Sequence, residues 1–485
     1  MGERRHWRSV EGAALPISQR PVAFALLGVC ALLVSLAGCT TSPSDGTTDS
    51  SSKSAPVPVA NETSTAEPVA GQETVQHSVQ PTVQPTVQST ALPANDGPGV
   101  TINVPGDAPT IQAAVDKAKP GDLVLIGPGT YNEAVFVRTE RVVIRGTNRN
   151  TVILDGKDAL ENGITAAANG VAVENLTVHN YLVNGIVFTK KYEDNADSLT
   201  AEDVVLNGYR ASYITAYNNG LYGLYAFYAS NGQMDNSYVS GNPDGGIYIG
   251  QCKPCNAVIT DIVGERNAIG FLGTNASGNL SVINSVWRKN KIGLLPQSED
   301  SELLAPQQDV LLAGNLVEDN NGGEAPSYKS WGYGIVIGGG QNNKVIRNQV
   351  RGHKTAGVFV TDLAQYLPLR NTVRDNSLSA NGVDLAYGSS TAKTGPWAGG
   401  QNCFENNRFG SSTPAGIEAA LPCNGKEQTV ETFPLGLQSA PGNVDYRTVI
   451  KPVTQPSMPD ASTSAVQPAV GLPVPIDVSS INVPQ

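Results

Sequence analysis

Apolar residues recur along this chain in short runs, and each run begins at a glycine. The glycines that begin four successive runs are separated by 23, 24 and 23 residues: Gly223, Gly246, Gly270 and Gly293. Short apolar runs separated by turn residues at this period are typical of a repeat that stacks one coil on the next. The pattern therefore predicts a parallel β-solenoid with one coil per repeat.

An asparagine lies just before each glycine, which predicts how the coils turn and stack. These residues are Asn219, Asn242, Asn267 and Asn290. Asparagine and glycine tolerate the left-handed backbone that a sharp corner needs. Stacked asparagine side chains can also hydrogen-bond from coil to coil.

Strand alternation divides each run into an inner and an outer set. The residues one and three positions after the glycine are apolar or small and are predicted to point inward. The residues between them are predicted to point outward: Val187, Tyr225, Tyr248, Leu272, Leu295, Val336 and Phe359. An apolar outer stripe of this length predicts either a binding surface or a covered face.

Both ends of the solenoid carry predicted caps. Ile111, Ala114, Val115 and Ala118 lie on one helical face, so residues 109–118 are predicted to form a helix over the first coil. A second short helix is predicted at residues 414–421. Such caps would cover edges that otherwise invite strand-to-strand aggregation.

Two segments resemble a known family. TIQAAVDKAKPGDLVLIGPGTYNEAVFV is similar to the first coils of right-handed parallel β-helix (pectate-lyase-like) proteins. GNPDGGIYIGQCKPCNAVITDIVGERN resembles the secreted right-handed β-helix repeat proteins of actinobacteria. The resemblance implies an all-β fold, a single-stranded right-handed parallel β-helix over residues 99–430. It implies no single activity, since this superfamily includes lyases, hydrolases, epimerases and proteins without catalysis.

The remaining segments differ in composition. Arginines precede an apolar run that ends in Leu36-Ala37-Gly38-Cys39, so residues 1–38 are predicted to be a secretory signal. LAGC resembles the bacterial lipobox, which implies lipidation of Cys39 and an extracytoplasmic protein anchored to the outer face of the cytoplasmic membrane. A single-pass anchor is the alternative, but the run is short for a span. Residues 39–98 read as a disordered Ser/Thr/Pro/Val/Gln-rich tether, and residues 431–485 as a Pro/Ser-rich tail.

Charge and cysteine content narrow the chemistry. The formal net charge of −11 makes nucleic acid an unfavourable partner. Four cysteines remain after the signal and Cys39, and we expect the disulfides Cys252–Cys255 and Cys403–Cys423. A redox or metal role for Cys252 and Cys255 is the alternative, but no second C-x-x-C or histidine partner accompanies them.

Two long insertions, residues 190–208 and 297–309, are predicted to leave the same corner four coils apart. They would bracket a trough on the outer stripe, in which aromatic faces and amides could bind a short oligosaccharide. The predicted substrate-binding residues are Tyr209, Arg210, Tyr225, Tyr228, Tyr248, Gln251 and Asn275. Alternatively the two insertions, with Leu303 and Leu304, or the C-terminal tail cover the stripe.

The catalytic candidates lie near the asparagine row and are Asp244, Glu265, Arg266 and Arg288. A lyase, epimerase or glycoside hydrolase needs an acid, a base or a group that neutralises charge, and these residues have that chemistry. Such residues also commonly solvate a coil corner. No metal site is predicted, and Ca²⁺ has no ligand cluster to support it. His179 and His353 are isolated in the sequence and are predicted to be silent surface residues.

Three functions remain open. The first is a monomeric surface lipoprotein that binds or processes polysaccharide or cell-wall glycan, and the second is a structural or adhesive solenoid without catalysis. The third is a periplasmic copper-accessory protein, which the three methionines and four histidines of the chain disfavour.

Overall fold

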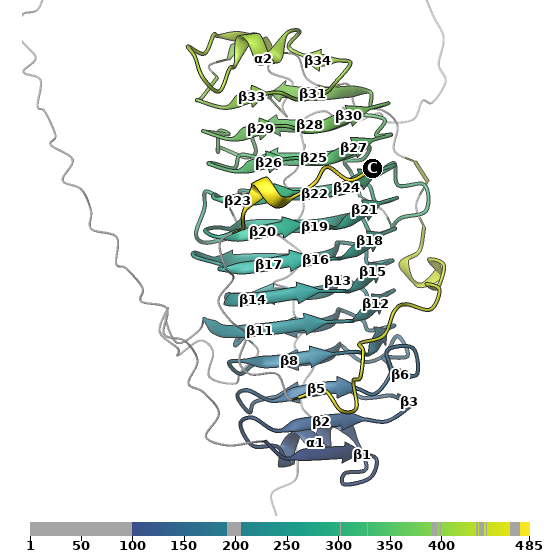
Figure 1. Ribbon diagram of the computed structural model, residues 1–485. Coiled ribbons are helices and arrows are strands. Elements are labelled where there is room, and N and C mark those ends of the chain that lie inside the picture. The colour runs from purple at the N-terminus through teal and green to yellow at the C-terminus, as the bar shows by residue number, and fades with distance from the viewer. Residues whose placement is uncertain are drawn as a thin grey trace, which may run out of the picture. The chain divides into compact units, whose positions relative to one another are not determined.

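The computed structural model describes residues 99–191, 205–300, 302–326, 328–389, 395–397, 399–432, 435, 441–442, 444–465 and 476–485. The predicted signal, Cys39 and the tether lie outside the described residues, as does most of the first insertion. The described chain is an all-β, right-handed parallel β-helix in which three parallel sheets run the length of the coil stack (Figure 1). The predicted fold class is confirmed.

Sheet A has 12 strands. Their bounds are β1 Thr101–Val104, β2 Leu123–Ile126, β5 Val143–Gly146, β8 Val171–Glu174, β11 Leu206–Ser212, β14 Ala229–Asp235, β17 Ala257–Thr260, β20 Leu280–Ile283, β23 Val310–Ala313, β26 Lys344–Ile346, β29 Thr372–Arg374 and β33 Cys403–Glu405.

Sheet B has 10 strands. They are β3 Gly129–Tyr131, β6 Val152–Asp155, β9 Thr177–His179, β12 Thr215–Tyr217, β15 Tyr238–Ser240, β18 Val263–Glu265, β21 Val286–Arg288, β24 Leu316–Glu318, β27 Gln349–Arg351 and β30 Ser377–Ser379.

Sheet C has 11 strands and contains the repeated apolar runs. Its strands are β4 Val135–Val137, β7 Asn162–Ala166, β10 Asn184–Phe188, β13 Tyr222–Phe227, β16 Gly245–Cys252, β19 Ile269–Ala276, β22 Ile292–Gln297, β25 Tyr333–Gly338, β28 Ala356–Thr361, β31 Val383–Gly388 and β34 Ser412–Thr413.

Both predicted caps are present. Helix α1 (Ile111–Lys117) packs against β1, β2 and β4, with its apolar face buried. Thr110 caps its N-terminus, since the Thr110 hydroxyl accepts a hydrogen bond from the amide of Ala113. At the other end the short helix α2 (Ile417–Ala420) contacts β33. Among the described residues no helix is long and apolar enough to cross a membrane.

Both predicted disulfides form. Cys252 and Cys255 close the turn after β16, and Cys403 of β33 is joined to Cys423 beyond α2. The second bond therefore ties the cap to the last coil. A two-stranded antiparallel sheet of β32 (Gly395–Trp397) and β35 (Val430–Thr432) lies outside the coils' own sheets.

The repeated glycines are required by close approach rather than by backbone conformation. A Cβ on Gly270 would lie 2.5 Å from the carbonyl oxygen of Gly293, and one on Gly293 would lie 2.6 Å from that of Gly334. The φ angles of these glycines are not in the left-handed region. The glycine row is therefore where the next coil's backbone passes too closely for any side chain.

The predicted asparagine stacking is confirmed, and the ladder is longer than predicted. The side chain of Asn242 donates to Asn267 at 2.8 Å, and the same bond joins Asn290 to Asn320 at 2.9 Å. The ladder comprises Asn219, Asn242, Asn267, Asn290, Asn320, His353 and Asn381. The left-handed residue lies one position earlier, as at Asn218 and Arg266, so the prediction that the ladder asparagines themselves form the corner was wrong.

His353 corrects a second prediction. It is fully buried in this ladder, where Asn381 contacts its Nδ1 at 2.8 Å and Asn320 contacts its Nε2 at 3.0 Å. Burial lowers the pKa of His353 to about 4. His353 is therefore a structural member of the ladder and not a surface histidine.

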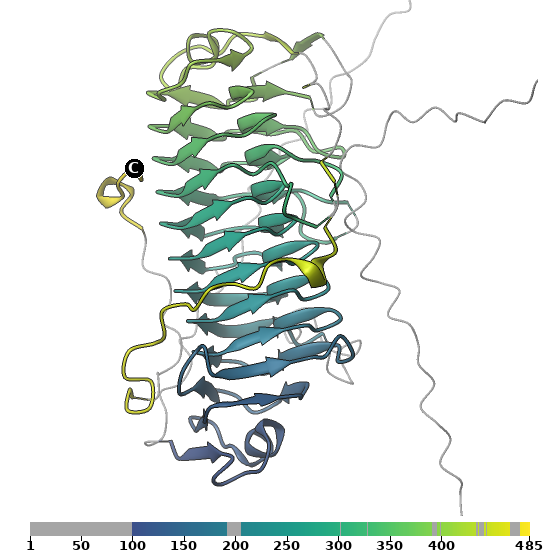
Figure 2. The ribbon, with the colours of Figure 1, turned by 90° about the vertical axis from the view of Figure 1, so that its right-hand side faces the viewer.

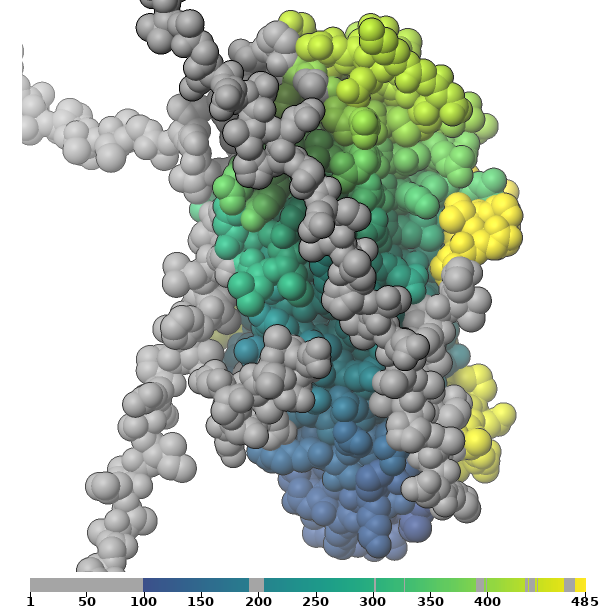
Figure 3. All heavy atoms as spheres, turned by 90° about the vertical axis from the view of Figure 1, so that its left-hand side faces the viewer, coloured from purple at the N-terminus to yellow at the C-terminus, as the bar shows by residue number. Residues whose placement is uncertain are grey.

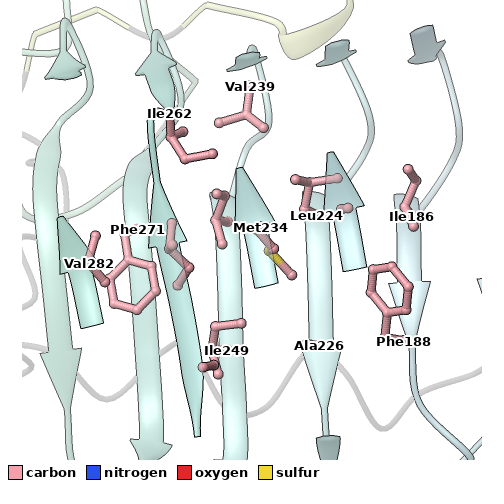
Figure 4. Packing of buried hydrophobic residues seen from close by; sticks show 14 of the residues in the cluster. Ile186, Phe188, Leu224, Ala226, Met234, Val239, Ile249, Ile262, Phe271 and Val282 are labelled. Atoms are coloured by element: carbon pink, nitrogen blue, oxygen red, sulfur yellow. The ribbon is translucent and has the colours of Figure 1, made fainter. Parts of the chain in front are cut away.

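The inner residues of sheet C form the main core with those of sheets A and B. Figure 4 shows Ile186, Phe188, Leu224 and Phe271 stacked along sheet C, with Met234 and Val282 of sheet A opposite them. The register pairs Ile186 with Leu224, as the glycine alignment predicts.

Two C-terminal segments lie against the coils. Residues 444–465 cross the stack, and residues 476–485 pack beside β20 and β23 (Figure 2). Figure 3 shows atoms of both segments against one flank of the solenoid. The described parts of the predicted tail are thus docked on the fold.

Candidate functional site

The outer stripe of sheet C has the predicted register. Val187 pairs with Tyr225, Tyr225 with Tyr248, Tyr248 with Leu272, and Leu272 with Leu295. Tyr248, Leu272 and Leu295 belong to a hydrophobic cluster separate from the main core, and Tyr225 packs against that cluster. Their outward direction is therefore confirmed.

The prediction of an open trough was wrong, because the outer stripe is largely buried. Leu295 is 0% exposed, Tyr248 3% and Phe359 6%. The stripe residues pack on one another, and Leu363, Tyr328 and Leu435 join their cluster from outside the sheet. The alternative in which the insertions cover the stripe holds for the second insertion at Tyr248, whose hydroxyl donates to Glu302 of that loop, although Leu303 and Leu304 themselves are exposed, at 68% and 40%. Leu435 brings part of the C-terminal region to the stripe, as the other alternative predicted.

An aromatic group forms the stripe near β13 and β16. The ring of Tyr222 stacks on Tyr225 at 5.1 Å between centroids and lies 4.8 Å from Tyr248. Phe227 continues the group from Tyr225 at 5.6 Å and meets Tyr228 edge to face at 4.7 Å. Tyr225, Phe227 and Tyr228 are only half-buried, so they form the accessible rim of this group.

Two carboxyl groups bind the buried phenols of this group. The Tyr222 hydroxyl donates to Asp244 Oδ2 at 2.6 Å, and the Tyr248 hydroxyl donates to Glu302 Oε1 at 2.8 Å. The second oxygens of both groups, Asp244 Oδ1 and Glu302 Oε2, are buried without a hydrogen-bond partner. We call Tyr222, Tyr225, Phe227, Tyr228, Tyr248, Asp244 and Glu302 the aromatic–carboxyl cluster.

The loop after β22 supplies Glu302 and is fixed by Asn275. The Asn275 side chain donates to the carbonyls of Glu299 and Glu302 at 2.8 and 3.1 Å, and its Oδ1 accepts from the amide of Glu299 at 3.0 Å. All polar atoms of the Asn275 side chain are thus engaged, and the residue is fully buried. Asn275 positions the loop and is not available to a ligand, so its predicted contact with substrate was wrong.

Gln251 is also buried, at 2% exposed, and its Oε1 has no hydrogen-bond partner. It lies close enough to Glu302 to favour the charged form of that carboxyl. It was predicted to bind substrate on the floor of the trough, whereas the structure places it beneath the surface.

The electrostatics of the cluster favour neutral acids. Burial raises the pKa of Asp244 to about 6 and that of Glu302 to about 7. The negative charges of Glu299 and Asp244 raise the pKa of Glu302 further, while the Tyr248 hydrogen bond opposes these effects. Burial also raises the pKa of both Tyr222 and Tyr248, so the phenols remain proton donors. Carboxyls tuned to this range are suited to acid–base chemistry near neutral pH.

Tyr209 and Arg210 do not belong to this site. Tyr209 is fully buried in the main core, with its ring 5.1 Å from that of Phe188. Arg210 lies on sheet A and forms an ion pair with buried Glu174. Their prediction as one end of the trough was wrong because β11 belongs to sheet A and not to sheet C.

Three of the four catalytic candidates form an ion-pair ladder on sheet B. Glu265 pairs with Arg266 on the same coil and with Arg288 on the next coil at 2.7 Å. The ladder continues through Glu318 to Arg351 at 2.9 Å. Only Asp244 lies in the aromatic–carboxyl cluster, so the structure separates Glu265, Arg266 and Arg288 from it.

Within the described residues no group of three or more His, Cys, Asp or Glu side chains could hold a metal ion. The aromatic–carboxyl cluster supplies two carboxyls, each bonded to a phenol, and so it offers protons and hydrogen bonds as its chemistry.

Sequence reasoning missed Tyr222 and Glu302. Counting alternation back from inward Leu224 places Tyr222 inside, but the alternation is interrupted at Gly223 and Tyr222 joins the outer cluster. Glu302 lies in an insertion whose path no periodicity describes. The only available signal was the insertion's own acidity, in Glu299, Asp300 and Glu302.

Comparison with known proteins agrees with the fold. Residues 162–378 match the family described as "Right handed beta helix region". No curated protein matches the chain at a significant level. Among solved structures, the A-module of the mannuronan C-5 epimerase AlgE4 of Azotobacter vinelandii is 14% identical, with 65% of this chain and 94% of that chain covered and a TM-score of 0.41.

Two further solved structures are similar to the chain. Pectate lyase Pel9A is 14% identical over 65% of this chain and 78% of that chain, with a TM-score of 0.42. PfbA, a surface adhesin of Streptococcus pneumoniae, is 14% identical over 65% of this chain and 92% of that chain, with a TM-score of 0.36.

Proposed function

The chain is a right-handed parallel β-helix whose residues 162–378 match that family, and we propose that its aromatic–carboxyl cluster binds a polysaccharide. The observation that carries the proposal is the pair of phenol–carboxyl hydrogen bonds, Tyr222–Asp244 and Tyr248–Glu302, beneath half-exposed aromatic rings. Aromatic faces stack on pyranose rings, a contact that the half-buried rings can make, while the two carboxyls hold the buried phenols in place.

The charge of the cluster favours a neutral sugar polymer. Asp244, Glu299 and Glu302 interact electrostatically there, and each raises the energy of a nearby negative charge. The described cation at the rim is Lys191, whose Nζ lies 5.1 Å from the centre of the Tyr228 ring. A polyanionic glycan would meet net repulsion from the carboxylates once the pH exceeds about 7.

Processing of the bound polymer is the finer form of this proposal. A carboxyl with a pKa of about 7 keeps its proton near neutral pH and can act as a general acid toward a glycosidic oxygen. Glu302, which is half-buried, is the residue for this role, whereas Asp244 is 5% exposed and binds the Tyr222 hydroxyl.

Binding should be tested with residues 40–485, because the docked C-terminal segments belong to the fold. A glycan array followed by titration with each retained polysaccharide measures affinity, and chromatography of the products detects cleavage. We expect Tyr225→Ala and Tyr228→Ala to weaken binding at least tenfold. The matched control is Tyr213→Ala, which removes a half-buried tyrosine that is not on sheet C. Equal binding by all three variants would disprove the site.

A non-catalytic structural or adhesive solenoid is the second candidate. The complete burial of Val187 and Leu295 favours it, because a covered stripe needs no ligand to shield it from water. A folded protein that binds no glycan, with or without Ca²⁺, would decide for this candidate and would direct the search to protein partners.

We also propose that the protein is lipid-anchored at Cys39 on the outer face of the bacterial cytoplasmic membrane. The Leu36-Ala37-Gly38-Cys39 sequence after an apolar run supports this. The full chain should partition into detergent when expressed in a bacterial host, and Cys39→Ala should abolish the partitioning.

A further inference from the structure

Residues 450–465 are bound by a row of polar side chains on the first coils, and we call this row the tail groove. Its lining residues are Arg145, Arg149, Asn150, Asn175 and Glu174, from the corners and strands between sheets A and B. We propose that the tail groove is a peptide-binding site that recognises a proline-containing segment, extended at its centre, and that its ligand is the chain's own residues 450–465.

The centre of the groove binds the segment through both its amide and its carbonyl groups. Asn150 accepts a hydrogen bond from the amide of Gln455 at 2.9 Å and donates to the carbonyl of the same residue at 2.9 Å. This pair of hydrogen bonds resembles the pairing between residues of two adjacent β-strands, but here both bonds are made by the single side chain of Asn150. It fixes the register of the segment in the groove.

Asn175 fixes the next residues. Its Oδ1 accepts from the amide of Met458 at 2.7 Å and from the hydroxyl of Ser457 at 2.8 Å. The Ser457 hydroxyl in turn accepts from the amide of Arg149 at 3.1 Å. The Ser457 hydroxyl therefore both donates a hydrogen bond to the groove and accepts one from it.

Two buried arginines bind carbonyls of the segment. Arg149 is 2% exposed and donates to the carbonyl of Pro456 at 3.0 Å. Arg145 is fully buried, pairs with Glu174 at 2.6 Å, and donates to the carbonyls of Ala461 and Ser464. Hydrogen bonds from a charged group are stronger than neutral ones, so these contacts give the groove affinity for free carbonyls.

The composition of the segment suits this recognition. Pro452, Pro456 and Pro459 lack an amide hydrogen and have a fixed φ. Prolines at this spacing favour an extended chain and reduce the entropy lost on binding. Residues 450–458 are extended, whereas residues 459–464 form turns in which the carbonyl of Asp460 accepts from the amides of Thr463 and Ser464. The groove and the segment are therefore complementary in both hydrogen bonding and conformation.

The direct test is binding between separate molecules. The chain is ended at Gly442, and a synthetic peptide of residues 450–465 is titrated into it by calorimetry. We expect saturable one-to-one binding, weakened about tenfold or more by Asn150→Ala, which removes both Gln455 hydrogen bonds. A peptide with Ser457→Ala should also bind more weakly. Asn279→Ala, an exposed asparagine of another coil corner, is the matched control and should bind like the parent.

Absence of binding by the folded shortened chain up to about 1 mM peptide, the concentration that a short tether can supply, would overturn the proposal. If the shortened chain does not fold, hydrogen exchange on the full chain gives the answer. Excess peptide in trans and the Asn150→Ala substitution should each accelerate exchange at the amides of Gln455 and Met458. Unchanged exchange in both experiments would show that the segment is held by other contacts and would also overturn the proposal.

Discussion

Asn320 donates a hydrogen bond from its side-chain nitrogen to Nε2 of His353, at 3.0 Å, inside the asparagine ladder. The same nitrogen donates to the carbonyl of Trp287 at 3.0 Å, which fixes the orientation of the amide. On its other side His353 contacts Oδ1 of Asn381, which can only accept, at 2.8 Å. The imidazole is therefore neutral, with its proton on Nδ1, and protonation would set two donors against each other at Nε2.

This arrangement predicts acid sensitivity. The folded-state pKa of about 4 is below the ordinary 6.5, so between these values the unfolded chain binds a proton that the folded chain does not. His353 thus lowers stability as the pH falls from about 6.5 to 4, by at most about 1.4 kcal/mol per pH unit. His353→Asn, which continues the ladder with its commonest residue, should lose this part of the pH dependence. Denaturant unfolding across this range measures it.

Unfolding at pH 8 is the control for His353→Asn, because the histidine is neutral in both states there and any difference reports packing alone. Parallel pH profiles of the variant and the parent would contradict the role of His353.

The coil-to-coil contacts show how far periodicity predicts this fold. The spacing of Gly223, Gly246 and Gly270 predicts the register of sheet C, because every coil must repeat the same close contact. Periodicity could not show that the glycines are required by the close approach of the next coil. The same Gly–Asn pattern is equally compatible with glycines that form left-handed corners. His353 could not be placed because the residues between Gly293 and Gly334 break the period before the ladder reaches it.

Gly270→Ala should destabilise the solenoid strongly. The new Cβ would lie 2.5 Å from the carbonyl oxygen of Gly293 and 2.8 Å from Cε3 of the buried Trp287, so two coils would have to separate. Overpacking of this kind costs about 1–3 kcal/mol or more. Gly323→Ala is the matched control, because a Cβ there meets nothing within 4 Å. Equal melting temperatures for the two variants would disprove the close-approach explanation.

Arg288→Met tests the ion-pair ladder of sheet B. Arg288 is 42% exposed and pairs with Glu265 at 2.7 Å, so its loss should cost no more than about 1 kcal/mol and the cost should shrink in high salt. Glycan binding should be unchanged, because Arg288 lies outside the aromatic–carboxyl cluster. A large loss of binding in a variant of normal stability would return Arg288 to the site.

The candidate site was predicted only in part, and particular residues show why. Tyr225 and Tyr248 follow from strand alternation, and Asp244 from its nearness to the repeat. Tyr209 was misplaced because an aromatic residue after an insertion can rejoin any of three sheets. Glu302 depends on how Asn275 anchors the loop, which is a tertiary contact between residues 24 to 27 positions apart.

The pH dependence of stability distinguishes Glu302 from an ordinary surface acid. Its folded-state pKa of about 7 exceeds the ordinary value of 4.5, so between these values the folded chain holds a proton that the unfolded chain has lost. Stability from this group is therefore complete below about pH 4.5 and is lost as the pH rises to about 7. The slope is at most about 1.4 kcal/mol per pH unit.

Glu302→Gln keeps an oxygen that can accept from Tyr248 and carries no charge, so the variant should be more stable than the parent at pH 8 and should have a flatter profile. Glu161→Gln, an exposed acid in the turn before β7, is the control and should retain the parent's slope. If Glu302→Gln also retained that slope, Glu302 would be an ordinary solvated acid, and its assignment as the acid of the aromatic–carboxyl cluster would be wrong.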